Sequence, residues 1–376
     1  MSTYFKSDKP RSANDPERQK LVPEHLMDIA PRPDACPMDI KTLHGLLQYA
    51  IHLELTTIPA YLTTLYSIKE GTNEASSIIC RSIAVEEMLH MVMAANILNA
   101  VGGKPHITSA ETVPAYPAEL TKLCTPFPIN LEKFSQSSIS TFMEIEQPHA
   151  LPKHHCDKIC FESIGDFYNT ISEGMKYLEA EASKRNTTIF TGNHKLQVTE
   201  NEYYGAGGKL IAVYKIEDAL IAISEIVGQG EGVDGSIIDP DSIFFHQDVE
   251  YAHYYRFKEI YCGRYYCEQD KPHENPNGEP FPVDWDAVHN MQLNPKLSDY
   301  KVGSELWNNT YEFNKTYMAL LENIEKACTG NPKILRDGIG LMYDLKYKAT
   351  ALMNMPTGNL DNDGKPLMAG PTFERI

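Results

Sequence analysis

The stretch Ser82–Asn99, SIAVEEMLHMVMAANILN, carries the clearest structural signal in this chain of 376 residues. Its apolar residues recur at the spacing of one helix face, and they are Ile83, Met88, Met91, Ala94, Ala95 and Leu98. Glu87 and His90 stand three positions apart within this stripe, so both side chains point to the same buried face. A buried carboxylate and imidazole need a partner that offsets the loss of water, and a metal ion is one such partner.

A Glu-x-x-His pattern occurs three times in the chain, whereas about one occurrence is expected by chance. Glu146 to His149 contains Pro148 and cannot lie inside a helix, so we interpret it as the chance match. Glu250 to His253 lies in a second stretch that we predict to be helical. Each of the two remaining pairs follows a predicted helix with an inward-facing glutamate. This repeat is typical of a carboxylate-bridged dimetal site in a four-helix bundle.

Composition narrows the class of protein. A chain of this length can bury one large core or two modest ones. The net charge of −17 lacks the basic excess that neutralises phosphates, so we expect no nucleic-acid partner. No apolar run is long enough for a membrane span, and the N-terminal segment lacks the apolar core of a secretory signal. We therefore expect a cytoplasmic protein without a membrane partner, whose eight scattered cysteines are reduced.

The periodicity predicts an extended N-terminal arm over residues 1–37 and a single all-α domain over residues 38–376. We expect bundle helices at about 40–70, 74–101, 215–232 and 242–262, and accessory helices at about 164–184, 304–328 and 332–355. Asp39 is the predicted N-cap of the first helix. The proline-rich insertion 104–160 is too long for a plain connection, so we expect it to cover one end of the bundle.

Two further ligands are predicted on the first and third bundle helices. Glu54 lies on the apolar stripe of the first helix and therefore faces the core. On the third helix, Glu225 lies about two turns from the expected end near Gly232, at the same level as Glu250 on an antiparallel fourth helix. We therefore predict Glu225 as the ligand. Glu231 is kept as an alternate ligand or a residue at the rim of the substrate entrance.

The predicted metal ligands are three pairs, Glu54 with Glu225, Glu87 with His90, and Glu250 with His253. About four carboxylates balance the charge of two divalent ions in a buried site. Carboxylate and imidazole ligands favour iron or manganese over metals that prefer sulfur. We expect two iron ions as the cofactor, with manganese as the alternative, and open coordination positions for O2 or a substrate.

The repeat of a glutamate-bearing helix followed by Glu-x-x-His resembles the ferritin-like superfamily. This likeness implies a ferritin-like four-helix bundle with additional packing helices and long loop insertions. More narrowly, the chain resembles the ferritin-like domain of the iminophenyl-pyruvate dimer synthases of the violacein and chromopyrrolic acid pathways, enzymes of natural product biosynthesis. The matching stretches are Ile51–Ala60, AVEEMLHM, SIGDFYNTI, EIVGQGEG, DVEYAHYYRF and the terminal AGPTFE. The dimer synthases carry this domain within much longer chains.

These features predict a non-haem dimetal oxidase or oxygenase that acts with O2 on a small organic molecule such as an amino acid or its imine. The narrower resemblance implies, as an alternative, the oxidative dimerisation of an amino-acid-derived imine. An iron storage or detoxification protein is a third alternative, although the long insertions would obstruct packing into a shell. A scaffold that has lost its metals is the fourth, against which the retained ligand types argue. The oligomeric state, including a homo-oligomer, stays open.

Overall fold

The structure is a computed structural model, which describes residues 37–148, 160–205, 207–232, 236–239, 250–267, 269–272 and 274–376. Its α-helices are α3 (Ile40–Ser67), α4 (Glu74–Ala100), α5 (Gln136–Ile145), α6 (Ile164–Ser183), α7 (Ile216–Glu231), α9 (His253–Cys262), α10 (Glu305–Thr329) and α11 (Gly338–Leu352). Short 3-10 turns are η1 (His194–Leu196), η2 (Leu297–Asp299) and η3 (Pro332–Asp337). Within the described residues, β1 (Ala118–Glu119) pairs antiparallel with β2 (Pro128–Ile129), and β3 (Pro356–Leu360) with β4 (Pro366–Met368). The prediction of an all-α bundle is confirmed, whereas the predicted N-terminal arm lies almost wholly outside the described residues.

Helices α3 and α4 form the long half of the bundle. Helix α3 has 28 residues and α4 has 27, and the short link between them makes the two helices antiparallel neighbours. The predicted N-cap is confirmed, because Asp39 Oδ1 accepts a hydrogen bond of 2.7 Å from the Thr42 amide. Each helix buries an apolar stripe in the main core. The polar side chains of Glu54, Glu87 and His90 lie within these stripes and are buried with them.

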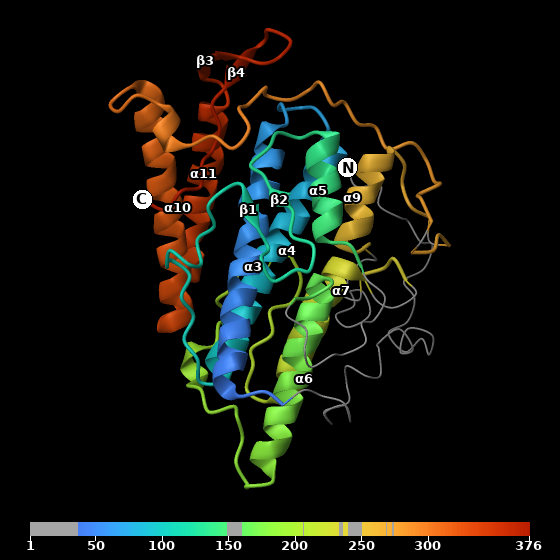
Figure 1. Ribbon diagram of the computed structural model, residues 1–376, viewed down its shortest axis with the longest axis vertical. Helices are drawn as coiled ribbons and strands as arrows, with labels where there is room; N and C mark the ends of the chain where they lie inside the picture. The colour runs from blue at the N-terminus through green and yellow to red at the C-terminus, as the bar shows by residue number, and fades with distance from the viewer. Residues whose placement is uncertain are drawn as a thin grey trace.

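The other half of the bundle is built from two shorter pairs of helices (Figure 1). Helix α6 packs on α7 and α3, and α7 packs on α4. Helix α9 packs on α5 and α4, and this pair stands above α6 and α7 in Figure 1. The C-terminal ends of α5 and α7 and the N-terminal ends of α6 and α9 therefore meet beside the middles of α3 and α4.

Two of the expected elements differ from the observed ones. The helix predicted as an accessory at 164–184 is α6, which is a column of the bundle itself because it packs on both α7 and α3. The helix predicted at 242–262 begins only at His253 within the described residues. The backbone before it is extended, because the Asp239 amide donates to the Glu250 carbonyl at 2.8 Å and the Ala252 amide donates to the Ile237 carbonyl at 3.1 Å.

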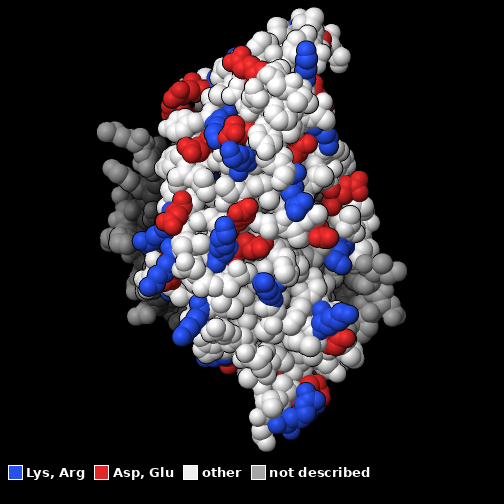
Figure 2. All heavy atoms as spheres, turned by 90° about the vertical axis from the view of Figure 1, so that its left-hand side faces the viewer, with Lys and Arg blue, Asp and Glu red and all other residues white. Residues whose placement is uncertain are grey.

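Helices α10 and α11 pack on each other and lie outside the bundle. Helix α11 contacts α3 and α10 contacts α4, on the left-hand side of Figure 1. On this side of the molecule, basic and acidic side chains are interspersed over the whole height of the surface (Figure 2). Among the helices that the structure describes, none combines the length and the apolar character needed to cross a bilayer.

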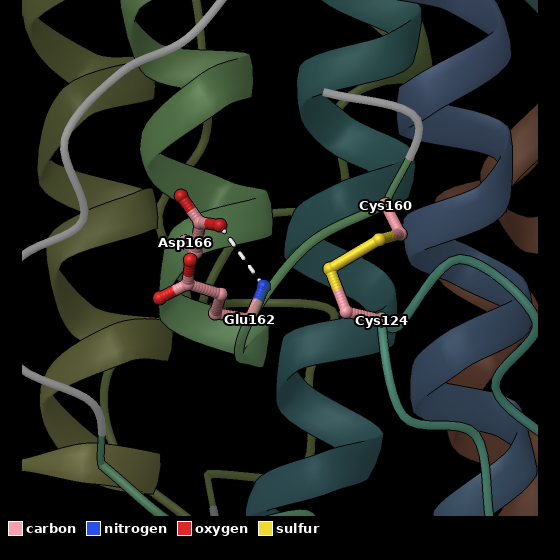
Figure 3. The surroundings of a disulfide bond; sticks show 4 residues. All are labelled: Cys124, Cys160, Glu162 and Asp166. Carbon is pink, nitrogen blue, oxygen red and sulfur yellow. Dashed lines mark hydrogen bonds between the residues drawn. A yellow bond between two sulfur atoms is a disulfide. The ribbon is translucent and has the colours of Figure 1, made fainter.

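A disulfide joins the insertion to the start of α6 (Figure 3). Cys124 and Cys160 are bonded, with their Cα atoms 4.8 Å apart, and the Cys124 amide donates to the Phe161 carbonyl at 2.8 Å. The Glu162 amide then donates to Asp166 Oδ2 at 3.0 Å in the first turn of α6. The expectation of reduced cysteines is wrong for this pair, because backbone pairing brings together two thiols that are 36 residues apart in the sequence.

Candidate metal centre

Two groups of buried acids and imidazoles lie where the helix ends meet α3 and α4. The first group is Glu54, Glu87 and His90, and the second is Glu87, Glu146 and His253. In each group the atoms that could bind a metal lie within 4.8 Å of one another. All five side chains are buried, and the most exposed, Glu146, retains only 4% of its surface. Glu87 belongs to both groups and therefore joins them.

The local structure explains how each of these side chains reaches the centre. Glu54 lies near the middle of α3, and Glu87 and His90 lie one turn apart on the inner face of α4. Glu146 is the C-cap residue of α5, and His253 is the first residue of α9. Three donors thus come from helix interiors that the apolar stripe orients, and two come from helix ends that the bundle directs inward.

His90 presents Nδ1 to the carboxylates. This atom lies 3.7 Å from Glu87 Oε1 and 3.8 Å from Glu54 Oε2. The other ring nitrogen, Nε2, lies 2.7 Å from Gln229 Oε1. The Gln229 amide nitrogen donates to the Gly207 carbonyl at 3.2 Å, so its oxygen faces the ring and Nε2 of His90 is the donor. A neutral His90 therefore has its lone pair on Nδ1, directed at the two carboxylates.

His253 has the same arrangement on the opposite side of Glu87. Its Nδ1 lies 3.0 Å from Glu87 Oε1 and 3.5 Å from Glu146 Oε2, and its Nε2 lies 2.7 Å from Glu86 Oε2. Glu86 is held in turn by the Arg256 guanidinium, which contacts both carboxylate oxygens and donates through Nη1 to Oε1 at 3.1 Å. Burial opposes ionisation of Glu86, but Arg256 and His253 hold its pKa below the ordinary value. An ionised Glu86 accepts the Nε2 proton of His253 and so leaves Nδ1 as the nitrogen that faces the centre.

The electrostatics of the centre favour a bound cation. Burial, and after it the charge of Glu87, raises the pKa of Glu54 well above its ordinary value. Burial opposes ionisation of Glu87 too, yet the imidazoles of His253 and His90 lower its pKa. Nδ1 of His253 is buried and, within the described part of the chain, makes no hydrogen bond of acceptable geometry. Burial opposes protonation of His253, but the carboxylates of Glu146, Glu86 and Glu87 raise its pKa well above the ordinary value, so a metal at its Nδ1 would displace a proton. Three carboxylates and two imidazoles whose Nδ1 atoms face them fit divalent metal ions.

Glu225 and Glu231, the predicted residues of the third helix, lie outside both groups. Glu225 is buried one turn before Gln229, whose amide nitrogen lies 3.4 Å from Glu225 Oε1. Glu231 Oε1 accepts a hydrogen bond of 2.7 Å from the Gly165 amide at the start of α6, where a helix N-terminus favours a negative charge. Glu225 thus lies behind a residue that orients His90, and Glu231 joins α7 to α6.

Glu250 also lies outside the centre, which corrects the fourth-helix prediction. Its side chain is 55% exposed, and its Oε2 lies 3.6 Å from Nη1 of Arg256. The rule that residues three apart share a face applies only inside a helix, and Glu250 precedes the first turn of α9. Glu146 lies beside His253 instead. Its only signal in the sequence was the pattern that Pro148 excludes from a helix interior, and His149 lies outside the described residues.

The chain belongs to the Ferritin-like family. The family profile of that name matches residues 47–262, which include all five side chains of the centre. A crystal structure of a ferritin like protein from Caulobacter vibrioides shares the fold, with a TM-score of 0.59 and 23% identity, and covers 90% of this chain and 100% of that one. The family and the two groups of side chains are compatible with metal binding.

Two curated relatives are enzymes by name. The chain is 26% identical to the 2-imino-3-(indol-3-yl)propanoate dimerase of Chromobacterium violaceum, over 91% of this chain and 35% of that protein. It is 22% identical to the dichlorochromopyrrolate synthase of Lentzea aerocolonigenes, over 78% of this chain and 29% of that protein. The chain thus spans about a third of the length of these relatives.

Proposed function

We propose that this chain is a non-haem di-iron oxidase or oxygenase that uses O2 to oxidise a small organic molecule, such as an amino acid or its imine. The observation that carries the proposal is the pair of buried donor groups that share Glu87. One iron would be held by Glu54, Glu87 and His90, and the other by Glu87, Glu146 and His253. The bound irons would supply the electrons for the reduction of O2.

The residues of the chain itself perform three tasks in this proposal. Gln229 and Glu86 hold the two imidazoles so that Nδ1 of each ring faces the carboxylates. The bundle core excludes water from the carboxylates, since none of them is more than 4% exposed. The ends of α5, α6, α7 and α9 interrupt the helical wall at this level, and we propose that the substrate approaches through this junction.

A second candidate is the oxidative coupling of two amino-acid-derived imines. The printed names of the two relatives favour it, because one is an imine dimerase and the other a synthase of a chromopyrrolate. Joining two imines through a new carbon–carbon bond removes two hydrogen atoms, for which O2 is a suitable acceptor. Because this chain spans only about a third of those proteins, the coupling is proposed as the alternative to oxidation of a single molecule.

Iron loading and O2 uptake together test the proposal. The chain is loaded with Fe(II) without O2, its iron content is measured, and O2 consumption is then followed with indole-pyruvate and phenyl-pyruvate imines. We expect about two irons per chain and substrate-dependent O2 uptake, with mass spectrometry distinguishing an oxidised monomer from a coupled dimer. Glu87→Ala should lose both properties while keeping its helical circular dichroism. Glu322→Ala, which removes an exposed carboxylate on α10, is the control and should keep them.

Less than one iron per chain, together with no effect of Glu87→Ala, would contradict the proposal. Uptake of many irons per chain without any substrate dependence would instead favour iron storage.

A further inference from the structure

Each of the three carboxylates in the candidate centre has one oxygen occupied by a hydroxyl group. Tyr61 donates to Glu146 Oε1 at 2.6 Å, and Tyr168 donates to Glu54 Oε1. Thr57 Oγ1 lies 3.0 Å from Glu87 Oε2 and also 2.9 Å from the carbonyl oxygen one turn back in α3, so it shares its proton between the two. The two tyrosines are fully buried.

The second oxygen of each carboxylate is the one that faces an imidazole. Glu54 Oε2 lies 3.8 Å from Nδ1 of His90. Glu146 Oε2 lies 3.5 Å from Nδ1 of His253. Glu87 Oε1 lies 3.7 Å from Nδ1 of His90 and 3.0 Å from Nδ1 of His253. The hydroxyl groups and the imidazoles therefore contact opposite oxygens of every carboxylate.

This division of the oxygens has a direct chemical consequence. A carboxylate can bind a metal through one oxygen or through both, and rotation of the side chain switches between the two modes. A hydroxyl that donates to one oxygen opposes this rotation, because turning that oxygen toward a metal would leave the buried donor without an acceptor. The cost is largest for Tyr61 and Tyr168, whose rings are packed against aromatic neighbours and cannot follow the carboxylate.

We propose that Tyr61 and Tyr168 are positioning residues that restrict Glu146 and Glu54 to binding through a single oxygen, one tyrosine for each metal. This inference rests on the proposed di-iron centre and deepens it. It also assigns the two hydroxyls to different metals, since Tyr168 acts on the carboxylate beside His90 and Tyr61 on the carboxylate beside His253. Neither tyrosine contacts the reacting atoms in this proposal.

Mössbauer spectroscopy of the chain loaded with iron-57 under saturating, anaerobic conditions tests the assignment. Two irons in unlike surroundings give two quadrupole doublets. We expect Tyr61→Phe to shift one doublet and Tyr168→Phe to shift the other, while both variants still hold two irons with about 10-fold weaker affinity. Tyr317→Phe is the matched control, because it removes a buried hydroxyl on α10 that has no hydrogen-bond partner within the described residues.

The outcomes separate this inference from the proposed function. If the unmodified chain does not hold two irons, the di-iron proposal fails. If it holds them and neither tyrosine variant changes its doublets, or both variants change the same doublet, the positioning proposal is overturned and the di-iron proposal stands. A tyrosine variant that folds but cannot be saturated with iron also overturns it, because the hydroxyls would then be needed to hold the metals. Thr57→Val, expected to alter both doublets, provides an independent variant.

Discussion

Oε1 of Glu87 lies 3.0 Å from Nδ1 of His253. The carboxylate comes from the middle of α4 and the imidazole from the first turn of α9, so this contact joins the long half of the bundle to its interrupted half. The same oxygen lies 3.7 Å from Nδ1 of His90, which makes Glu87 the side chain common to both donor groups. A metal bound in either group would therefore be held in part by Glu87.

Replacing each acid singly by its amide should show that Glu146, and not Glu250, contributes to metal affinity. We expect Glu146→Gln to weaken binding of the metal beside His253 by about 10-fold to 100-fold, because it removes a buried anionic donor. Glu250→Gln should change metal affinity by less than about twofold, since its carboxylate is half exposed and lies outside the centre. Titration of the metal-free chain with Fe(II) under anaerobic conditions measures both. A stronger effect for Glu250→Gln would show that the sequence pattern identified the ligand correctly.

Stability should depend on pH through Glu259, which lies on α9 and belongs to neither donor group. Burial raises the pKa of Glu259 to about 7, although it accepts a hydrogen bond from the Tyr266 amide at 2.8 Å. Its unfolded pKa is about 4.3, so between these values the folded chain binds more protons and the free energy of unfolding falls as pH rises. Glu259→Gln removes this loss, and its stability relative to wild type should rise by up to about 3 kcal/mol from pH 4.5 to pH 8.

Urea unfolding of the two chains across this pH range gives the difference directly. A difference that stays constant with pH would contradict the burial of an ionisable carboxyl at this position. Glu322→Gln, at an exposed position, should show no such trend.

Buried and exposed ion pairs of this structure should differ in their contribution to stability. Arg256→Met leaves the buried Glu86 without its guanidinium partner, and we expect a loss of about 3–5 kcal/mol in the free energy of unfolding. Lys326→Met breaks an exposed pair with Glu322 and should cost at most about 1 kcal/mol. Urea denaturation measures both. Equal losses would mean that Glu86 does not need Arg256 to remain charged.

Breaking the disulfide should destabilise the fold. The bond between Cys124 and Cys160 closes a loop of 36 residues, for which the chain-entropy relation gives a stabilisation of up to about 4 kcal/mol. The double substitution of both cysteines by serine should lower the free energy of unfolding by that order. Cys262→Ser removes an exposed free thiol and is the control. Thiol titration of the unfolded chain before and after reduction checks the bond itself. Equal numbers of reactive thiols in the two samples would contradict it.

Much of the fold could be predicted because long helices with regular apolar stripes can be recognised from the periodicity of the sequence. Helices α3 and α4 appear within a few residues of their predicted bounds, and α6 opens after Ser163, whose hydroxyl accepts a hydrogen bond of 3.1 Å from the Asp166 amide. The pair Glu87 and His90 follows from the same periodicity, because both lie inside a helix where the three-residue spacing holds.

The remaining part of the centre lies at helix ends, where periodicity carries no information. Glu146 caps α5 and His253 begins α9, so their proximity is set by how separate helices stack and not by spacing along the chain. Gln229 lies in the glycine-rich last turn of α7. A Cβ at the neighbouring Gly230 would lie 3.3 Å from Glu146 Oε2. From the sequence, these glycines predict only a helix that loosens at its end. In the structure, the missing side chain at Gly230 leaves room for the Glu146 carboxylate.

Two metals should bind in the groups that share Glu87, and diffraction at the iron absorption edge can show where each one lies. Crystals of the iron-loaded chain should give two anomalous peaks, one among Glu54, Glu87 and His90 and the other among Glu87, Glu146 and His253. The absence of any peak, or a single peak beside Glu225 or Glu250, would show that these two groups do not hold a metal pair.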